Sequence, residues 1–181
     1  MSSINIAYVK TRFGELIVGS YQNQLCLCDW RYRKARDRVD QRIKQTLDAN
    51  YILQEDEIIA QTINELDEYS AGHRQVFGVP LLLAGSEFQQ QVWRELIKVP
   101  YGASVSYLAL SKRIGNEKAI RAVANANGAN AISIIVPCHR VIGSDGKLVG
   151  YAGGLDTKKR LLAMEAINSG HGGMRETLDL F

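Results

Sequence analysis

Apolar and polar residues alternate along three short stretches near the start of the chain, and this period of two predicts β-strands. The stretches are Ile4–Lys10, Gly14–Ser20 and Gln24–Trp30, and short turns separate them. Three strands at such close spacing predict an antiparallel meander.

Helical periodicity follows the strands. Arg31–Ala49 is rich in charge with apolar residues four apart, and Ile58–Tyr69 repeats isoleucine and leucine at helical spacing. Gly78–Gly85 is short and extended, either a strand or a linker. Residues 1–85 are therefore expected to form an N-terminal α/β domain, with the boundary at Ala84–Ser86.

The chain then changes character. Phe88–Ile97 places apolar residues on one helical face and stops before Pro100. Ser106 is expected to cap a second helix that Gly115 closes, and Glu117–Asn127 forms a third. Two helices joined by a short glycine-containing turn are the signature of a helix-turn-helix.

The remaining pattern predicts a winged-helix-like domain over residues 86–168. Ala131–Val136 is a run of apolar residues that predicts a buried strand, and Val141–Tyr151 predicts a hairpin. Thr157–Ala166 is expected to be the last helix. Residues 169–181 are interpreted as a tail.

Composition excludes several classes of protein. Of the 181 residues, 46% are hydrophobic and 23% charged, which is ordinary for a globular chain and rules out wholesale disorder or a collagen-like repeat. No run approaches the roughly 18 apolar residues of a membrane helix, and the chain does not start like a signal peptide. Three cysteines are too few, and odd in number, for a disulfide framework. We therefore expect a cytoplasmic protein that makes no use of a membrane.

Charge is unevenly distributed along the chain. Residues 1–85 carry 10 basic and 11 acidic side chains, whereas residues 88–164 carry 11 basic and 4 acidic ones. An excess of basic residues in one part of a protein is typical of a nucleic-acid partner, although many solvated helix faces are basic too.

The three cysteines differ in their surroundings. Cys26 and Cys28 alternate with leucines inside a predicted strand, so we interpret them as core residues; His73 alone could not complete a zinc site with them. Cys138 instead follows Pro137 at the end of an apolar run, beside a histidine and an arginine. There a thiol is expected to reach solvent and to be drawn toward thiolate by positive charge.

The segment Pro137-Cys138-His139-Arg140 resembles the active-site motif of the O6-alkylguanine-DNA alkyltransferases, also called methylated-DNA–protein-cysteine methyltransferases. The resemblance runs from Gly85 to about Glu165. It includes Phe88-Gln89-Gln90-Gln91-Val92-Trp93, Val105-Ser106-Tyr107, Ala119-Ile120-Arg121-Ala122-Val123, Asn130 and Gly150-Tyr151-Ala152-Gly153-Gly154.

The resemblance implies an α+β fold, with a small ribonuclease-H-like N-terminal antiparallel sheet and helices before the winged-helix-like domain that carries the active site. It implies irreversible transfer of an alkyl group from O6-alkylguanine in double-stranded DNA to Cys138, a single-turnover repair reaction. His139 would act as base through a water and Glu165 would orient it, while Tyr107 would contact the flipped base and supply a proton. No cofactor or metal is implied.

The resemblance also assigns the DNA contacts. Arg121 would hold the gap left by the flipped base, and Asn130 would brace the helix-turn-helix against the active-site strand. Small residues would let the recognition helix approach the minor groove: Ala119, Ala122 and Ala126. The base pocket would be formed by Val141, Tyr151, Ala152 and Gly153, together with backbone groups of Cys138.

Two departures from the family pattern affect the last helix, where Lys159-Arg160 precede the leucine pair and Met164 replaces a histidine. The sequence leaves open the range of alkyl groups, activity on O4-alkylthymine, and whether the expected monomer binds DNA cooperatively.

Other classes of protein explain fewer features. A cysteine hydrolase would use Cys138 and His139 but would not need a helix-turn-helix. A winged-helix regulator has no need of a reactive cysteine, and a catalytically inactive alkylguanine-binding relative would lack Cys138.

Overall fold

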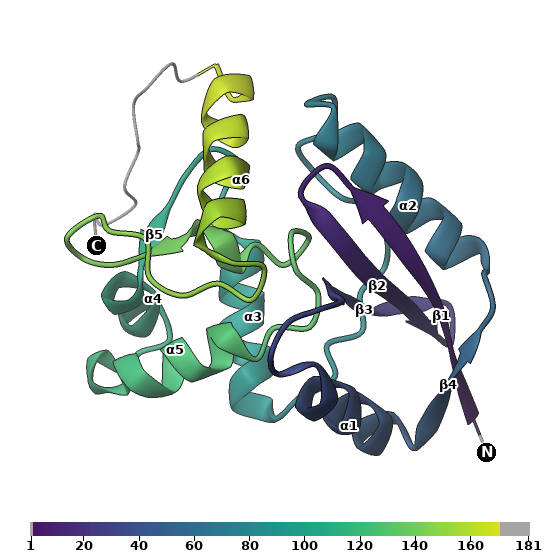
Figure 1. The fold of residues 1–181 in the computed structure, drawn as a ribbon. Coiled ribbons are helices and arrows are strands. Elements are labelled where there is room, and N and C mark those ends of the chain that lie inside the picture. The colour runs from purple at the N-terminus through teal and green to yellow at the C-terminus, as the bar shows by residue number, and fades with distance from the viewer. Residues whose placement is uncertain (1, 171–181) are drawn as a thin grey trace. The chain divides into compact units, whose positions relative to one another are not determined.

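The computed structural model describes residues 2–170, and the chain divides into two compact units, Met1–Gly85 and Ser86–Phe181 (Figure 1). The predicted tail beyond Gly170 lies outside the described residues.

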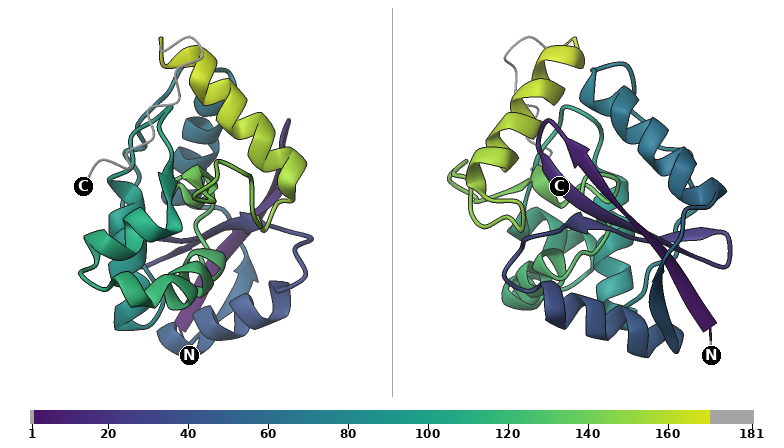
Figure 2. Two further views of the ribbon diagram at one scale, coloured as in Figure 1. Left: turned by 90° about the vertical axis from the view of Figure 1, so that its left-hand side faces the viewer. Right: turned by 45° about the vertical axis from the view of Figure 1, so that its right-hand side comes forward.

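The N-terminal unit is built on a four-stranded sheet. Its strands are β1 (Ser2–Thr11), β2 (Gly14–Tyr21), β3 (Gln24–Trp30) and β4 (Ala49–Leu53), in the order β3-β2-β1-β4. The first three are antiparallel, which confirms the predicted meander, and Figure 2 shows β1 and β2 as a long twisted hairpin. The fourth strand pairs parallel to β1 and was not predicted, because a short edge strand with exposed residues carries little hydrophobic alternation.

Two helices accompany this sheet, α1 (Arg36–Leu47) and α2 (Glu57–Ser70). α1 begins five residues later than predicted, because the backbone N–H of Arg31 still bonds to the Glu15 carbonyl at 3.0 Å and continues the sheet. Asp56 caps α2 by accepting the Ile59 N–H at 2.9 Å. The buried apolar side chains of both helices lie in the core of this unit, as the helical spacing predicts.

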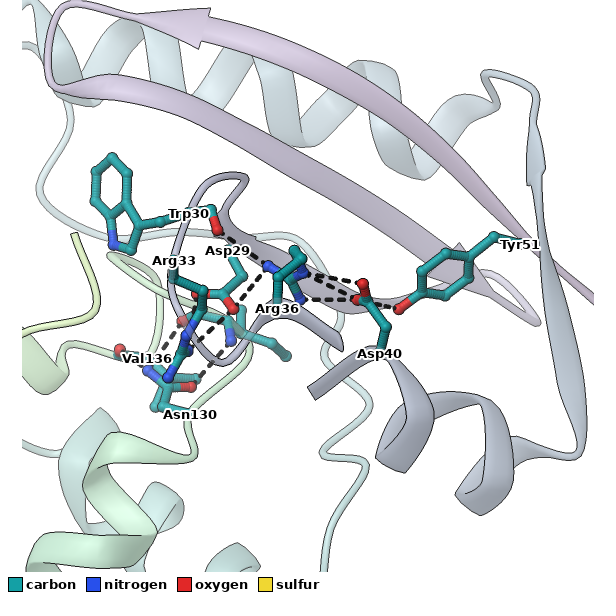
Figure 3. Close-up of polar contacts among 9 residues, drawn as sticks. Asp29, Trp30, Arg33, Arg36, Asp40, Tyr51, Asn130 and Val136 are labelled. Atoms are coloured by element: carbon teal, nitrogen blue, oxygen red, sulfur yellow. Dashed lines mark hydrogen bonds and ion pairs between the residues drawn. The ribbon is translucent and has the colours of Figure 1, made fainter. Parts of the chain in front are cut away.

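A polar network fixes α1 against the neighbouring strands (Figure 3). The carboxylate of Asp29 is fully buried and accepts from Arg33 and Arg36, each at 3.0 Å. Arg36 also pairs with Asp40 at 2.8 Å, and the Tyr51 hydroxyl donates to the same carboxylate at 2.8 Å. Because every buried charge in the network has a partner, its burial is tolerated.

The C-terminal unit is mainly helical. Its elements are α3 (Glu87–Ile97), α4 (Tyr107–Arg113), the 3₁₀ turn η1 (Glu117–Ala119), α5 (Ile120–Gly128) and α6 (Leu155–Asn168). Ser86 and Gln89 form a capping box at the start of α3, and Ser106 caps α4 by accepting the Ala109 N–H at 3.0 Å. The predicted helices are thus confirmed, and the α+β fold class with them.

The predicted strand and hairpin of this unit are wrong. Residues 131–136 form a buried turn, and only β6 (Val141–Ile142) follows, paired in parallel with β5 (Val105–Ser106). After β6 the chain makes a tight turn, in which the Gly143 N–H bonds to the Lys147 carbonyl at 2.9 Å, and no second strand forms. An apolar run signals burial but does not distinguish a strand from a buried turn.

Candidate active site

A turn held by one side chain leads the chain to Cys138. The Asn130 carboxamide accepts the Ile132 N–H at 3.0 Å and donates to the Val136 carbonyl at 2.9 Å; Figure 3 labels Asn130 and Val136. Ile134 has a φ of 73°, which a β-branched residue rarely adopts. The hydrogen bonds of Asn130 to Ile132 and Val136, on either side of Ile134, hold it in this conformation. Asn130 is itself buried, so it supports this turn and does not lie on the outer surface.

Cys138 lies in the 3₁₀ turn η2 (Cys138–Arg140) and is only 5% exposed. The expectation that its thiol reaches solvent is therefore wrong, because the turn directs the side chain inward. Cys26 and Cys28 are buried as predicted, and burial raises the pKa of Cys26 to about 12 and that of Cys28 further. Thiols with raised pKa values react poorly, which agrees with the interpretation of Cys26 and Cys28 as core residues.

The neighbouring imidazole is paired with a carboxylate from α6. His139 Nε2 and Glu165 Oε1 lie 2.7 Å apart, and both side chains are fully buried. Glu165 therefore lies inside the protein and not on the solvent-facing side of α6.

Arg140 completes this buried group. Its Nε donates to Glu165 Oε2 and its Nη2 to Oε1, each at 2.9 Å, while Nη1 donates to the Val99 carbonyl at 2.7 Å. A bidentate arginine–carboxylate pair of this kind is among the stronger charge-assisted contacts. The guanidinium of Arg140, two residues after Cys138, is thus directed to the Glu165 carboxylate.

The electrostatics of the group define its protonation. Burial alone would raise the pKa of Glu165, but His139 and Arg140 hold it well below its usual range. Burial lowers the pKa of His139, and Glu165 offsets this only in part. A neutral imidazole beside an ionised carboxylate donates from Nε2, which leaves Nδ1 as an acceptor. Among residues 2–170, Nδ1 is buried and has no hydrogen-bond partner.

The tight packing around Glu165 depends on a glycine. The Gly102 N–H donates to Glu165 Oε2 at 3.4 Å, and Gly102 has a φ of 80°. A Cβ at this position would lie 2.6 Å from the Cβ of Ser169. Another residue here would therefore shift the end of α6 that carries the carboxylate.

Lys158 was missed by the sequence analysis, and it is fully buried on α6. Its ammonium donates to the carbonyls of Val149 and Gly150 at 3.1 and 3.3 Å. Burial lowers the pKa of Lys158 to about 8, and the charge of Cys138 offsets part of that effect. Lys158 lies three residues before Leu161 and seven before Glu165, so helical periodicity places it on the same buried face of α6. That spacing is the sequence signal that could have identified it.

The remaining predicted site residues lie around this group. The Tyr107 hydroxyl donates to the Val149 carbonyl at 3.4 Å, and burial followed by the charge of Cys138 raises the pKa of Tyr107. The Tyr151 ring meets that of His139 edge-on, with centroids 6.5 Å apart. Val141 is buried in β6, whereas Ala152 and Gly153 are half-buried in the loop before α6.

The helix-turn-helix presents some of its predicted residues and hides one. Arg121 and Ala122 are exposed near the start of α5, and Ala119 is half-buried in η1. Ala126 is only 3% exposed, and its carbonyl accepts the Trp93 indole N–H at 2.8 Å, so the expectation that it faces DNA is wrong. Ile120, which is 40% exposed, was not singled out, although it directly precedes Arg121.

Residues 2–170 contain no cluster of three or more histidine, cysteine or carboxylate side chains able to hold a metal ion. Over the same residues, every helix is too short or too polar to cross a membrane.

Comparisons with known proteins agree with the geometry of the C-terminal unit. The model of the 6-O-methylguanine DNA methyltransferase DNA-binding domain matches residues 87–167. The methylated-DNA–protein-cysteine methyltransferase of Mycobacterium leprae is 45% identical over 127 residues, 69% of this chain and 77% of the relative. That of Methanosarcina acetivorans is 49% identical over 113 residues, 62% of this chain and 72% of the relative.

Solved structures extend the likeness over most of the chain. The Mycobacterium tuberculosis O6-methylguanine methyltransferase has a TM-score of 0.76 at 34% identity, with 91% of this chain and 94% of that chain covered. The M. tuberculosis protein solved in complex with DNA also has a TM-score of 0.76, at 33% identity and with coverage of 92% and 94%. A hyperthermophilic Pyrococcus kodakaraensis methyltransferase shares the fold at 23% identity, with a TM-score of 0.61 and coverage of 90% and 98%.

The fold and the buried cysteine–histidine–glutamate group define the class of a cysteine-dependent alkyl acceptor joined to a helix-turn-helix. The chain belongs to the methylated-DNA–protein-cysteine methyltransferase family.

Proposed function

We propose that this protein repairs double-stranded DNA by moving the alkyl group of O6-alkylguanine to Cys138, which restores guanine directly. The observation that carries the proposal is the buried pairing of His139 with Glu165 directly beside Cys138, with Nδ1 unoccupied among the described residues. A soft sulfur nucleophile with a base beside it suits displacement at an sp3 carbon.

The proposed reaction exchanges the proton of Cys138 for the alkyl group of the base. His139 Nδ1 takes the Cys138 proton through a bridging water, and Glu165 fixes the imidazole in the tautomer that allows it. The thiolate attacks the alkyl carbon, a C–S bond forms, and the C–O6 bond breaks with its electron pair going to guanine. Guanine then takes a proton from Tyr107, which regains one from the imidazolium. The product is a neutral thioether.

Residues 86–168 are the proposed DNA-binding and catalytic domain, and the proposed DNA contacts all lie on it. A base inside a duplex must be flipped out before Cys138 can reach it. Arg121 fits the role of filling the gap because it is exposed near the start of α5, with the small residues Ala119 and Ala122 beside it. Family likeness supports approach from the minor groove, where inserted side chains unstack base steps and bend the duplex.

The flipped base would be held next to the nucleophile by the loop before α6. Backbone groups of Cys138, Val141 and Ala152 and the side chain of Tyr151 are the proposed contacts, and Gly153 permits close approach of the loop. The protein is expected to act as a monomer in the cytoplasm and to need no cofactor.

The decisive experiment mixes the protein with duplex DNA carrying O6-methylguanine and measures its intact mass. We expect a gain of one methyl group, located on the Cys138 peptide. Cys138→Ser should gain none yet bind the duplex as before, whereas Cys26→Ser is the matched control and should react normally. Methyl transfer by Cys138→Ser near the unaltered rate, or a methyl on another cysteine, would contradict the proposal.

A further inference from the structure

An exposed group of aromatic and charged side chains lies on the sheet of the N-terminal unit, and the proposed repair reaction does not use it. Lys10 of β1 is the register partner of Glu15 of β2, and Arg31, directly after β3, pairs with Glu15 at 2.8 Å. Tyr8 precedes Lys10 by two residues in β1, so its side chain lies on the same face of the sheet. Tyr32 follows Arg31. These five residues form what we call the stacking patch.

The Arg31 guanidinium lies against both tyrosine rings of the stacking patch. Its central carbon is 3.8 Å from the centroid of the Tyr8 ring and 5.3 Å from that of the Tyr32 ring. Both distances are within the roughly 6 Å over which a cation attracts an aromatic face. Tyr8 is nevertheless 45% exposed and Tyr32 78% exposed. Because the rings are already positioned at the surface, a flat ligand that stacks on them loses less conformational entropy on binding.

Charge is divided sharply within the N-terminal unit. Residues 8–44, which include the stacking patch, carry 9 basic and 4 acidic side chains, whereas residues 45–85 carry 1 basic and 7 acidic ones. The unit as a whole is close to neutral, so its average charge hides this division. A local excess of basic residues attracts an anionic ligand.

The basic groups next to the tyrosine rings can contact a phosphate. Lys10 is exposed, and so is Arg12 in the turn after β1. Within residues 2–170, the Arg31 side chain donates a single hydrogen bond, from Nη1 to Glu15 at 2.8 Å. A guanidinium has further N–H donors in a fixed plane, and these remain for the oxygens of a phosphate.

We propose that the stacking patch binds single-stranded nucleic acid, with an unpaired base on the tyrosine rings and a phosphate beside Lys10 and Arg31. Aromatic rings within a basic surface are the combination that holds single strands with little regard to sequence. The strand must be unpaired, because the bases of a duplex stack on one another and leave no face open to a tyrosine. A polyanion without bases, or an acidic peptide, uses the charge of the patch but not its rings.

The proposed binding site belongs to the N-terminal unit, whereas Cys138 and the helix-turn-helix belong to the other unit. It holds the protein on DNA that contains unpaired stretches, whether or not an alkylated base is present. The inference is therefore independent of the proposed alkyl transfer.

The first test measures how well a single-stranded oligothymidylate, with no alkylated base, protects Lys10 from acetylation by acetic anhydride. Protection is followed by peptide mass against oligonucleotide concentration, so it reports on the stacking patch even if the helix-turn-helix binds the same strand. Lys44 is the control in the same sample, because its ammonium lies 4.5 Å from the Tyr51 ring centroid at the β4 edge of the sheet. We expect protection of Lys10 and none of Lys44. An unchanged acetylation rate at Lys10 would overturn the proposal, and this test needs no variant.

The second test measures the contribution of the rings. Tyr32→Leu should raise the oligonucleotide concentration that half-protects Lys10 by at least about fivefold, because it removes an aromatic face on which a base stacks. Tyr32→Phe keeps the ring and should behave as the unaltered protein. Tyr21→Leu, at the opposite end of β2, is the matched control and should also behave as the unaltered protein. Equal half-protection in Tyr32→Leu and the unaltered protein would show that no base stacks there, and the proposal would fall.

The third test compares classes of ligand. Inorganic polyphosphate and polyglutamate carry negative charge without bases, so at equal charge concentration both should protect Lys10 less well than the oligothymidylate. Equal or better protection by polyphosphate would make the patch a general anion site, and the same result with polyglutamate would indicate an acidic protein partner; either overturns the proposal. Should Lys10 be protected as expected while Cys138 takes no methyl group from DNA, only the proposed function fails.

Discussion

His139 Nε2 lies 2.7 Å from Glu165 Oε1 although the two residues are 26 positions apart in sequence, one in a 3₁₀ turn and the other near the end of α6. Both side chains are fully buried, and both have lowered pKa values in the folded protein.

Acid should therefore destabilise the protein in two stages. Where folding lowers the pKa of a side chain, the unfolded chain binds a proton at a pH at which the folded protein does not. The free energy of unfolding therefore falls as pH drops. The loss should begin below about pH 6.5 from His139 and steepen below about pH 4.3 from Glu165. Urea unfolding at a series of pH values measures it. His139→Gln should remove the first stage of this loss. If the variant shows the same dependence of stability on pH, the buried neutral imidazole is not the cause of the first stage.

Arg140→Met should be strongly destabilising, by about 3–5 kcal/mol, because it leaves the Glu165 carboxylate without its bidentate partner. Arg140→Met with Glu165→Gln removes both charges and should recover much of the loss. Chemical denaturation of the single and double variants measures the coupling. Additive losses would show that the two side chains do not act as a pair.

Asn130→Ala should lower both stability and the reactivity of Cys138. The change removes the carboxamide hydrogen bonds to Ile132 and Val136 that hold the turn. The buried backbone groups left without these partners should lower the free energy of unfolding by about 1–3 kcal/mol in total. Asn125→Ala, at an exposed position of α5, is the control and should have little effect. The melting temperature and the rate at which iodoacetamide alkylates Cys138 provide the two readouts. A normal rate at reduced stability would separate the turn from the nucleophile.

Arg121→Ala should slow methyl transfer from duplex DNA far more than reaction with free O6-benzylguanine, since only the duplex requires a flipped base. Single-turnover rates on both substrates test this. Lys118→Ala removes a neighbouring exposed charge, so it should weaken DNA binding mainly at low salt and make binding less dependent on salt. Equal losses on both substrates would remove Arg121 from the proposed role.

The protein should be consumed by its own reaction. Neither His139 nor water can expel the alkyl carbon from a thioether at a useful rate, and thiol exchange acts on disulfides only. Progress curves with excess methylated DNA should stop at one equivalent of protein. A plateau clearly above one equivalent would mean that the thiol is regenerated.

The sequence by itself determined the local elements and the reactive segment. Alternation in β1–β3, the apolar faces of α2 and α3 and the caps at Ser86 and Ser106 are properties of neighbouring residues, and such signals are readable along the chain. The motif around Cys138 was equally local.

Only the tertiary structure decided how distant residues meet. Glu165 and Lys158 belong to a helix whose basic and acidic residues look solvated in sequence, yet packing against η2 and the preceding loop buries both. The same packing directs the Cys138 thiol inward, turns Ala126 toward Trp93, and makes a turn of residues 131–136, where the apolar pattern suggested a strand. Burial of a charge depends on a partner far along the chain, and periodicity carries no information on that partner.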